Sequence, residues 1–191
     1  ILRSSWLKLK DRITSLGLTS SDVAIDLGAN VGDVVQLLRT TGARVLAFEP
    51  DPVAFSVLQS RFASDTGVVC FQKAASDYDG EANLFLHEEV KSDRLKYSTG
   101  SSLCEDKNNV SSADSHTVRV IDIAEFIKRL PTKVKLLKID IEGEEHKVLN
   151  KLIDTGLASQ IEHILVETHE EKVPSCRAGM AKVRNKIKKN K

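Results

Sequence analysis

The sequence predicts a single α/β domain built on a doubly wound, mostly parallel sheet. Short apolar runs alternate along the chain with segments whose apolar residues recur every three or four positions. The first pattern is typical of buried parallel strands, and the second is typical of the helices that cover them. A glycine turn between the first apolar run and the first helical segment is a third sign, because open sheets bind ligands at such turns.

The expected elements follow one another with short connections. Residues 1–17 are predicted to form an N-terminal helix, because Trp6, Leu9 and Ile13 share one helical face and Gly17 can end it. Pro52 and Asp122 indicate the starts of two later helices, as a first-turn proline and an N-cap. Strands are expected at residues 23–27, 44–48, 67–71, 82–86, 117–121, 135–141 and 161–167.

Residues 76–116 interrupt this alternation, since most of the stretch is polar and rich in Ser, Asp and Lys. A long irregular insert in a compact domain is either a functional lid or a disordered segment, and the sequence leaves both open. Within it, Ser101 and Ser102 follow Gly100, where they either contact a ligand or face solvent.

The end of the chain, residues 177–191, carries only positive charges among its ionisable residues. Met180, Val183 and Ile187 nevertheless share one helical face, so we expect a basic C-terminal helix on the surface. An arm for nucleic acid or a membrane is the alternative.

Composition narrows the class of protein. The 191 residues carry a net charge of +1, so no global electrostatic attraction to nucleic acid or membranes is expected. No apolar run has the length of a membrane span. The three cysteines lack metal-ligand spacing, and we expect reduced thiols in a cytoplasmic protein. The chain begins at Ile1, which fits a fragment or a processed product, and its oligomeric state is not indicated.

The turn after the first strand has the pattern D-x-G-x-x-x-G, from Asp26 to Gly32. A dinucleotide fingerprint would need a second glycine where this chain has Asn30. An acidic residue beside the turn suits a cationic ligand better than a pyrophosphate, and S-adenosylmethionine offers a sulfonium and an amino group. Glu49 ends the second strand, 23 positions after Asp26, where an acid can accept hydrogen bonds from ribose hydroxyls.

Four blocks of sequence carry a family resemblance, at residues 26–32, 48–52, 137–145 and 166–169. On these blocks the chain resembles the FkbM-type methyltransferases, a branch of the class I S-adenosylmethionine-dependent fold. The first block is common to many class I enzymes, whereas the Lys-Ile-Asp-Ile-Glu-Gly stretch at 138–143 is more particular to this family. The resemblance implies O-methylation of a hydroxyl, often on a sugar, a lipid-linked glycan or a polyketide.

The resemblance also implies where the methyl donor lies. The methionine portion is expected along the glycine turn with Asp26 near its amino group, the ribose at Glu49, and the adenine near residues 74–76. Asp77 either bonds the adenine amino group or is a plain turn residue. The implied donor-binding residues are Asp26, Gly28, Ala29, Asn30, Val31, Gly32, Glu49, Pro50, Ala75, Ser76, Asp77 and Asp140. Class I sheets usually end in a further antiparallel strand pair, so we expect a sheet truncated after His169.

Three residues at the ends of later strands are the expected catalytic groups, namely Asp140, Glu142 and His169. A hydroxyl acceptor must lose its proton, and Asp140 is the leading base. Asp140 as a mere helix cap is the alternative, and Glu142 either orients ligands or favours the helix N-terminus. His169 has a pKa suited to base work. The three could also hold a divalent cation, although no metal is expected, since oxygen-rich sites normally need more ligands.

Two other functions fit the general fold. A nicotinamide-dependent oxidoreductase would use the same kind of sheet, but it would need the missing fingerprint glycine. A non-catalytic cofactor-binding module would be expected to have a damaged turn, and this one is intact. The sequence therefore favours a methyltransferase for a small-molecule or glycan acceptor.

Overall fold

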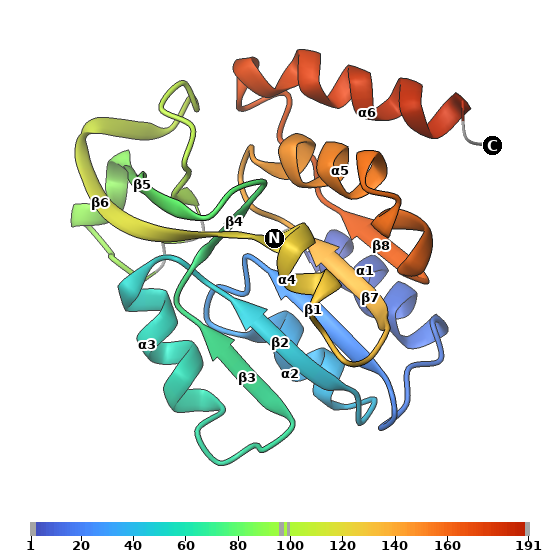
Figure 1. Cartoon of the computed structure of the whole chain (residues 1–191). Helices are drawn as coiled ribbons and strands as arrows, with labels where there is room; N and C mark the ends of the chain where they lie inside the picture. The colour runs from blue at the N-terminus through green and yellow to red at the C-terminus, as the bar shows by residue number, and fades with distance from the viewer. Residues whose placement is uncertain (1–2, 96–97, 99, 190–191) are drawn as a thin grey trace.

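Five parallel strands form the central sheet in the computed structural model, which describes residues 3–95, 98 and 100–189 (Figure 1). The strand order is β3-β2-β1-β7-β8, and each neighbouring pair is parallel. The strands are β1 (Val23–Leu27), β2 (Arg44–Phe48), β3 (Val68–Phe71), β7 (Val134–Ile139) and β8 (His163–Val166). The predicted α/β fold with a parallel sheet is confirmed.

The order of the strands creates a ligand crevice at β1. From β1 the chain moves outward through β2 to β3, and it later returns to pair β7 with the other side of β1. The direction of winding therefore reverses between β1 and β7. In open α/β sheets, ligands bind at the carboxyl ends of the strands beside such a reversal.

Helices cover both faces of this sheet, as a doubly wound fold requires. The helices α1 (Arg3–Ser15), α2 (Asp33–Arg39) and α3 (Pro52–Arg61) contribute apolar side chains to one buried cluster. The helices α4 (Ile123–Lys128) and α5 (Glu145–Asp154) contribute to a second cluster. Residues 1 and 2 of the expected N-terminal helix lie outside the described residues.

Sequence signals for helix starts agree with the structure. Pro52 opens α3, and the Asp51 side chain accepts hydrogen bonds from the backbone nitrogens of Val53 and Ala54. The Asp122 side chain caps α4 by accepting from the backbone nitrogen of Glu125. These caps satisfy backbone N–H groups that have no partner inside the helix.

A smaller sheet lies beside the central one, with the order β4-β6-β5. It comprises β4 (Ala74–Ser76), β5 (Gly80–His87) and β6 (Val110–Asp122), with β5 and β6 antiparallel (Figure 1). A short 3-10 helix, η1 (Glu88–Lys91), follows β5.

The expected insert at 76–116 and the expected strand at 117–121 both differ from the structure. β6 begins seven residues earlier than expected, at Val110 rather than at 117, and pairs with β5 over most of its length. Ser115, His116 and Thr117 are exposed, so this part of β6 needs no apolar residues and gives no strand pattern in the sequence. Residues 80–87 and 110–116 of the expected insert therefore belong to the antiparallel β5–β6 pair.

The C-terminal helix α6 (Arg177–Lys189) lies along α5 (Figure 1). It follows two 3-10 turns, η3 (Leu157–Gln160) and η4 (Pro174–Cys176). Met180 and Val183 are buried, whereas Ile187 is 44% exposed, so the apolar face is only partly covered. Residues 190 and 191 of the expected helix lie outside the described part of the chain. Among the described helices, none has the length and apolar character needed to cross a bilayer.

Candidate functional site

The turn after β1 is closed by a glycine that touches the neighbouring strand. Gly28 has a φ of +78°, and a Cβ atom there would lie 1.8 Å from the backbone oxygen of Asp140. The Asp140 nitrogen donates a hydrogen bond to the Leu27 oxygen at 3.1 Å. Because no side chain fits between these backbones, glycine brings the β1 turn against the end of β7.

The second glycine of the pattern has a different role. Gly32 has a φ of +92°, and a Cβ atom there would lie 2.5 Å from the Phe62 ring and 2.8 Å from Leu58. The residue precedes α2 and lets that helix pack closely against the α3 side of the molecule. Gly32 therefore supports the turn through packing.

A cavity of about 890 Å³ opens at the carboxyl ends of β1, β2 and β7. This volume is in the range of ligand sites, roughly 300–1,000 Å³. Of the residues predicted from the sequence, those that line the cavity are Gly28, Ala29, Asn30, Val31, Glu49, Pro50, Ala75, Asp140 and Glu142. Those outside its lining are Asp26, Gly32, Ser76, Asp77 and His169.

Glu49 is held rigidly on the cavity wall. Its Oε2 accepts a hydrogen bond from the Asn30 backbone nitrogen at 2.8 Å, and its Oε1 accepts from the Asp51 nitrogen at 2.8 Å. The side chain is 5% exposed. Burial raises the pKa of Glu49 to about 7, against the lowering effect of the two backbone hydrogen bonds. Glu49 is thus a fixed carboxyl group that faces the ligand space.

Asn30 connects this wall to the segment after β5. Its backbone has a φ of +48°, a conformation that asparagine tolerates better than most residues. Its side-chain nitrogen donates to Ser98 Oγ at 3.0 Å. Asn30 therefore holds both Glu49 and part of the expected insert at the cavity.

Asp26 faces a lysine inside the protein instead of the cavity. Its Oδ1 lies 3.0 Å from the Lys138 ammonium nitrogen, which also lies 3.4 Å from Asp140 Oδ2. Asp26 is fully buried and Lys138 is 6% exposed. Burial lowers the pKa of Lys138, but the charges of Asp26 and Asp140 outweigh it and raise the pKa above its ordinary value. The sequence led us to expect Asp26 beside the amino group of the donor, whereas in the structure Asp26 pairs with Lys138.

Lys138 was not among the residues predicted for the site. It stands between Leu137 and Ile139 in a strand that the sequence predicts to be buried on both faces. A charge in such a strand requires a partner, because an unpaired buried charge is very costly. The need of a buried lysine for an acidic partner was the signal that could have identified Lys138 as a site residue.

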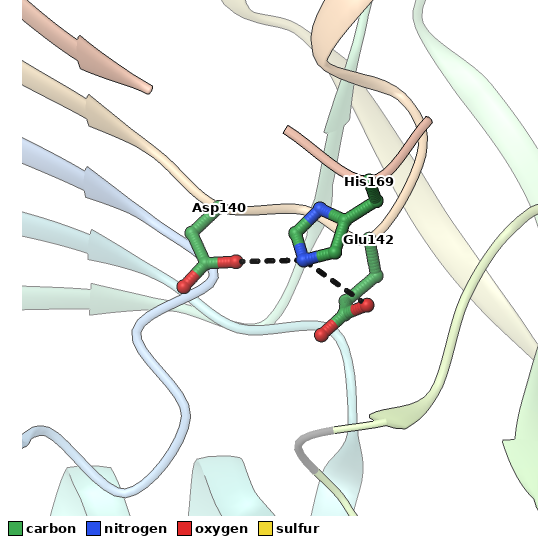
Figure 2. Close-up of side chains that lie close together, drawn as sticks. All are labelled: Asp140, Glu142 and His169. Atoms are coloured by element: carbon green, nitrogen blue, oxygen red, sulfur yellow. Dashed lines mark ion pairs between the residues drawn. The ribbon is translucent and has the colours of Figure 1, made fainter. Parts of the chain in front are cut away.

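Asp140, Glu142 and His169 lie close together, as Figure 2 shows. His169 Nε2 is 3.7 Å from Asp140 Oδ1 and 3.4 Å from Glu142 Oε2. The two acids follow β7, and the histidine follows β8. His169 is 3% exposed. The structure thus brings the three expected catalytic residues to one edge of the sheet.

A buried glutamate, Glu145, contacts the Nδ1 atom of His169, on the side of the ring away from Asp140 and Glu142. Glu145 Oε1 lies 2.8 Å from His169 Nδ1, and the Glu145 carboxylate also accepts from the backbone nitrogens of Ile141 at 3.2 Å and Gly143 at 3.1 Å. Burial lowers the pKa of His169, but the hydrogen bond that its ring donates to Glu145 and the charges of Glu142, Glu145 and Asp140 raise it above its ordinary value. Glu145 therefore orients the ring and directs Nε2 toward the two other acids.

Glu145 was also missed by the sequence analysis. It shares the spacing of the buried residues Val148, Leu149 and Leu152 on one face of α5 and is itself fully buried. An acid at a core position of an amphipathic helix was the available signal.

The segment after β5 covers one side of the cluster. The Lys107 ammonium nitrogen lies 2.8 Å from Glu142 Oε2, and it also donates to the Gly100 oxygen. Ser102 Oγ donates to the Glu142 backbone oxygen at 2.6 Å. Ser101, Ser102 and Lys107 all line the cavity. Because this stretch has no periodic pattern, Lys107 could not be predicted as a site residue.

Of the residues expected near the adenine, some line the cavity and others lie outside it. Ala75 lines the cavity. Ser76 Oγ instead donates to Glu144 Oε2 at 2.5 Å, and the Asp77 backbone oxygen accepts from Lys151 at 2.6 Å. A contact between Asp77 and an adenine stays a prediction.

The sequence model of a family described as the Methyltransferase FkbM domain matches residues 26–190. The chain is 27% identical over 168 residues to "Methyltransferase 1" of Beauveria bassiana (strain ARSEF 2860), covering 78% of this chain and 65% of the relative. It is 27% identical over 178 residues to "Methyltransferase sdnD" of Sordaria araneosa, covering 80% of this chain and 68% of the relative.

The solved structure of "Methyltransferase FkbM from Methylobacillus flagellatus KT" has a similar fold. The TM-score is 0.52 at 15% sequence identity, and the match covers 80% of this chain and 34% of that chain. The chain thus spans about two thirds of the two curated relatives and about one third of the solved chain. At this identity, the structural match establishes the fold alone.

Proposed function

The chain belongs to the Methyltransferase FkbM domain family, and on that premise we propose that it transfers the methyl group of S-adenosylmethionine to a hydroxyl oxygen. The acceptor is a sugar, a glycan or another small molecule. The donor already carries an activated methyl group, so the protein chiefly has to bind, align and desolvate the two reactants.

The observation that carries this proposal is the position of the Glu49 carboxyl group on the cavity wall. Two backbone nitrogens fix its oxygens, at Asn30 and Asp51, and each oxygen keeps a further lone pair for a ligand. A fixed acid at the end of β2, beside a glycine turn at the end of β1, is suited to accept hydrogen bonds from both hydroxyls of a ribose.

The charge of the cavity supports a cationic donor. Its lining holds more acids than lysines: the acids are Asp33, Glu49, Asp140, Glu142, Glu144 and Glu167, and the lysines are Lys73, Lys107, Lys138 and Lys172. Burial raises the pKa of Glu167, and the nearby charge of Asp140 raises it further. Such crowding of acids favours a ligand that carries a positive sulfonium and would repel the pyrophosphate of a dinucleotide. The cavity therefore fits S-adenosylmethionine better than a nicotinamide cofactor.

We assign the methionine portion of the donor to the turn from Gly28 to Val31, the ribose to Glu49, and the adenine to the wall at Ala75. Asp26 does not line the cavity but supports this wall, because its ion pair with Lys138 connects β1 to β7. Gly32 supports the same turn by packing against α3.

The acceptor is assigned to the part of the cavity beside Asp140 and Glu142. Asp140 and Glu142 line it, and Ser101 and Ser102 extend the wall from the segment after β5. Asp140, Glu142 and His169 together orient the acceptor oxygen and assist the loss of its proton. The products are the methyl ether, S-adenosylhomocysteine and one proton.

The net charge of +1 supports a small-molecule or glycan acceptor over a nucleic acid. Cys70, Cys104 and Cys176 are unpaired, and burial raises the pKa of Cys104 to about 12. Unreactive free thiols support a reducing compartment such as the cytoplasm.

The direct test is methyl transfer by the purified chain from methyl-labelled S-adenosylmethionine. A panel of hydroxyl compounds, including sugars and glycosides, is compared with matched amines and carboxylic acids. The proposal expects label in a methyl ether. Label only in N-methyl products or methyl esters would contradict the assignment to a hydroxyl, and failure to bind the donor would contradict the whole proposal.

A further inference from the structure

We propose that Asp140, Glu142 and His169 form a binding site for one divalent metal ion at the edge of the cavity. One ligand atom from each residue lies within 4.8 Å of the others (Figure 2). Two carboxylates and an imidazole are a ligand set that divalent cations such as Mn²⁺, Mg²⁺ and Zn²⁺ accept.

The spacing of the ligand atoms fits an ion better than a direct hydrogen bond. His169 Nε2 is 3.4 Å from Glu142 Oε2 and 3.7 Å from Asp140 Oδ1. A charged N–H···O bond has a length of about 2.7–2.9 Å. Atoms that each lie about 2.1–2.5 Å from a common ion are separated by roughly 3–4 Å. Both distances from His169 Nε2 therefore lie in the range that coordination gives, and the two carboxylates lie within 4.8 Å of each other.

The other side of the histidine ring is arranged as in metal sites. His169 Nδ1 lies 2.8 Å from Glu145 Oε1, and Glu145 is fully buried. Metal-binding histidines commonly donate their second ring N–H to a carboxylate, which fixes the tautomer and the ring orientation. With its proton on Nδ1, His169 presents a lone pair at Nε2 to two carboxylates. A metal cation between them would interact favourably with all three groups.

The backbone holds Glu142 in this position at a cost. Its φ is +56°, in the left-handed region that a residue with a Cβ atom rarely adopts. The Ser102 hydroxyl fixes its carbonyl oxygen at 2.6 Å. A non-glycine residue in this conformation is strained and persists where the surroundings require it. The strain is consistent with a residue placed for binding.

The neighbouring lysines leave the cluster negatively charged. Lys138 is shared between Asp140 and Asp26, and Lys107 lies beside Glu142. Neither lysine contacts Glu145, whose partners among the described residues are His169 and two backbone nitrogens. A divalent ion would supply the missing positive charge.

The role of the ion rests on the proposed function. Asp140 and Glu142 line the cavity, so an ion that they hold has its remaining coordination positions toward the ligand space. An acceptor hydroxyl that occupies one of these positions would be oriented toward the methyl group and would lose its proton to solvent more readily. Binding of the ion itself requires neither donor nor acceptor.

The test is binding of Mn²⁺ alone to the chelator-treated full chain, followed by electron paramagnetic resonance, with Mg²⁺ and Zn²⁺ as competitors. We expect one saturable site. Glu142→Gln and His169→Ala should each weaken the affinity at least tenfold, with circular dichroism confirming that the variants fold. His163→Ala is the matched control, because His163 lies beside Glu162 at the amino end of β8 and should leave Mn²⁺ binding unchanged.

Absence of a saturable site for any of the three ions would overturn the metal proposal, as would binding that Glu142→Gln and His169→Ala leave intact. In that case a proton on His169 Nε2 supplies the positive charge. Calorimetry with S-adenosylmethionine on the same metal-free preparation separates the two proposals. Donor binding without metal binding rejects only the metal site, and metal binding without donor binding rejects the proposed function.

Discussion

The ammonium nitrogen of Lys138 lies 3.0 Å from Oδ1 of Asp26, and the two residues are direct partners across the β1–β7 pair. Both are buried, so neither charge is solvated by bulk water. The pair is located at the reversal of strand order, and Lys138 also lines the cavity. It therefore connects the β1 strand to the end of β7, where Lys138 also lies 3.4 Å from Asp140.

Replacement of Lys138 by Met should destabilise the protein strongly. Removal of one partner of a buried ion pair leaves an uncompensated charge and costs about 3–5 kcal/mol. Lys135→Met is the control, since Lys135 lies on the same strand and forms a pair with Asp22 at 3.5 Å whose side chains are 21% and 20% exposed. A pair that water still reaches is worth about 0–1 kcal/mol. Urea denaturation measures both. Equal losses in the two variants would contradict the structural role of Lys138.

Replacement of Gly28 by Ala should destabilise the protein more than replacement of Gly17 by Ala. Both glycines have a positive φ, of +78° and +61°, but a Cβ atom at Gly17 would meet nothing within 4 Å. The Gly17 variant therefore measures backbone strain alone, about 1–2 kcal/mol. At Gly28 the methyl group also collides with the Asp140 oxygen, which should add at least about 1–3 kcal/mol. Similar midpoints of thermal unfolding would show that the close approach of β1 and β7 is not required.

Glu49 should make stability depend on pH. Its pKa rises from the ordinary 4.5 to about 7 on folding, because of burial. Between these values the folded protein binds more protons than the unfolded chain, so the contribution of Glu49 to stability falls as the pH rises from about 4.5 to about 7. Glu49→Gln cannot titrate. The stability of the native protein relative to this variant should drop by at least about 1 kcal/mol between pH 5 and pH 7.5, as urea denaturation can measure. A constant difference contradicts the prediction.

Asp140→Asn should reduce turnover and leave donor binding nearly unchanged. A positioned group that assists proton removal contributes roughly 10²–10⁴-fold to the rate, whereas the ribose contact at Glu49 remains. Single-turnover assays and calorimetry separate the two effects. Glu162→Gln, an exposed acid just before β8, is the control and should keep full turnover. Unchanged turnover in Asp140→Asn would remove Asp140 from the reaction.

The sequence was sufficient to predict the central sheet and much of the site. Parallel strands that are buried on both faces are mostly apolar, so β1, β2 and β7 were readily recognised. Asp140, Glu142 and His169 each follow the carboxyl end of a strand, and those ends meet at one edge of the sheet. Their proximity could therefore be expected from topology alone.

The remaining features depend on contacts between distant segments. The polar half of β6 is a strand because it pairs with β5, and its exposed side chains carry no apolar alternation. Lys107 reaches Glu142 from a segment without a periodic pattern. The spacing of Asp26 near the turn predicted a ligand contact, whereas its partner is Lys138, which pairing of β1 with β7 brings opposite to it.

The measurement that tests the account most directly is thermal unfolding of the chain with S-adenosylmethionine, S-adenosylhomocysteine and NAD in parallel. A ligand present at about 100 times its dissociation constant stabilises the folded state by about 2.7 kcal/mol. We predict that both adenosyl compounds raise the unfolding temperature and that NAD does not. A rise with NAD alone would contradict the assignment of a cationic methyl donor to the cavity at Glu49.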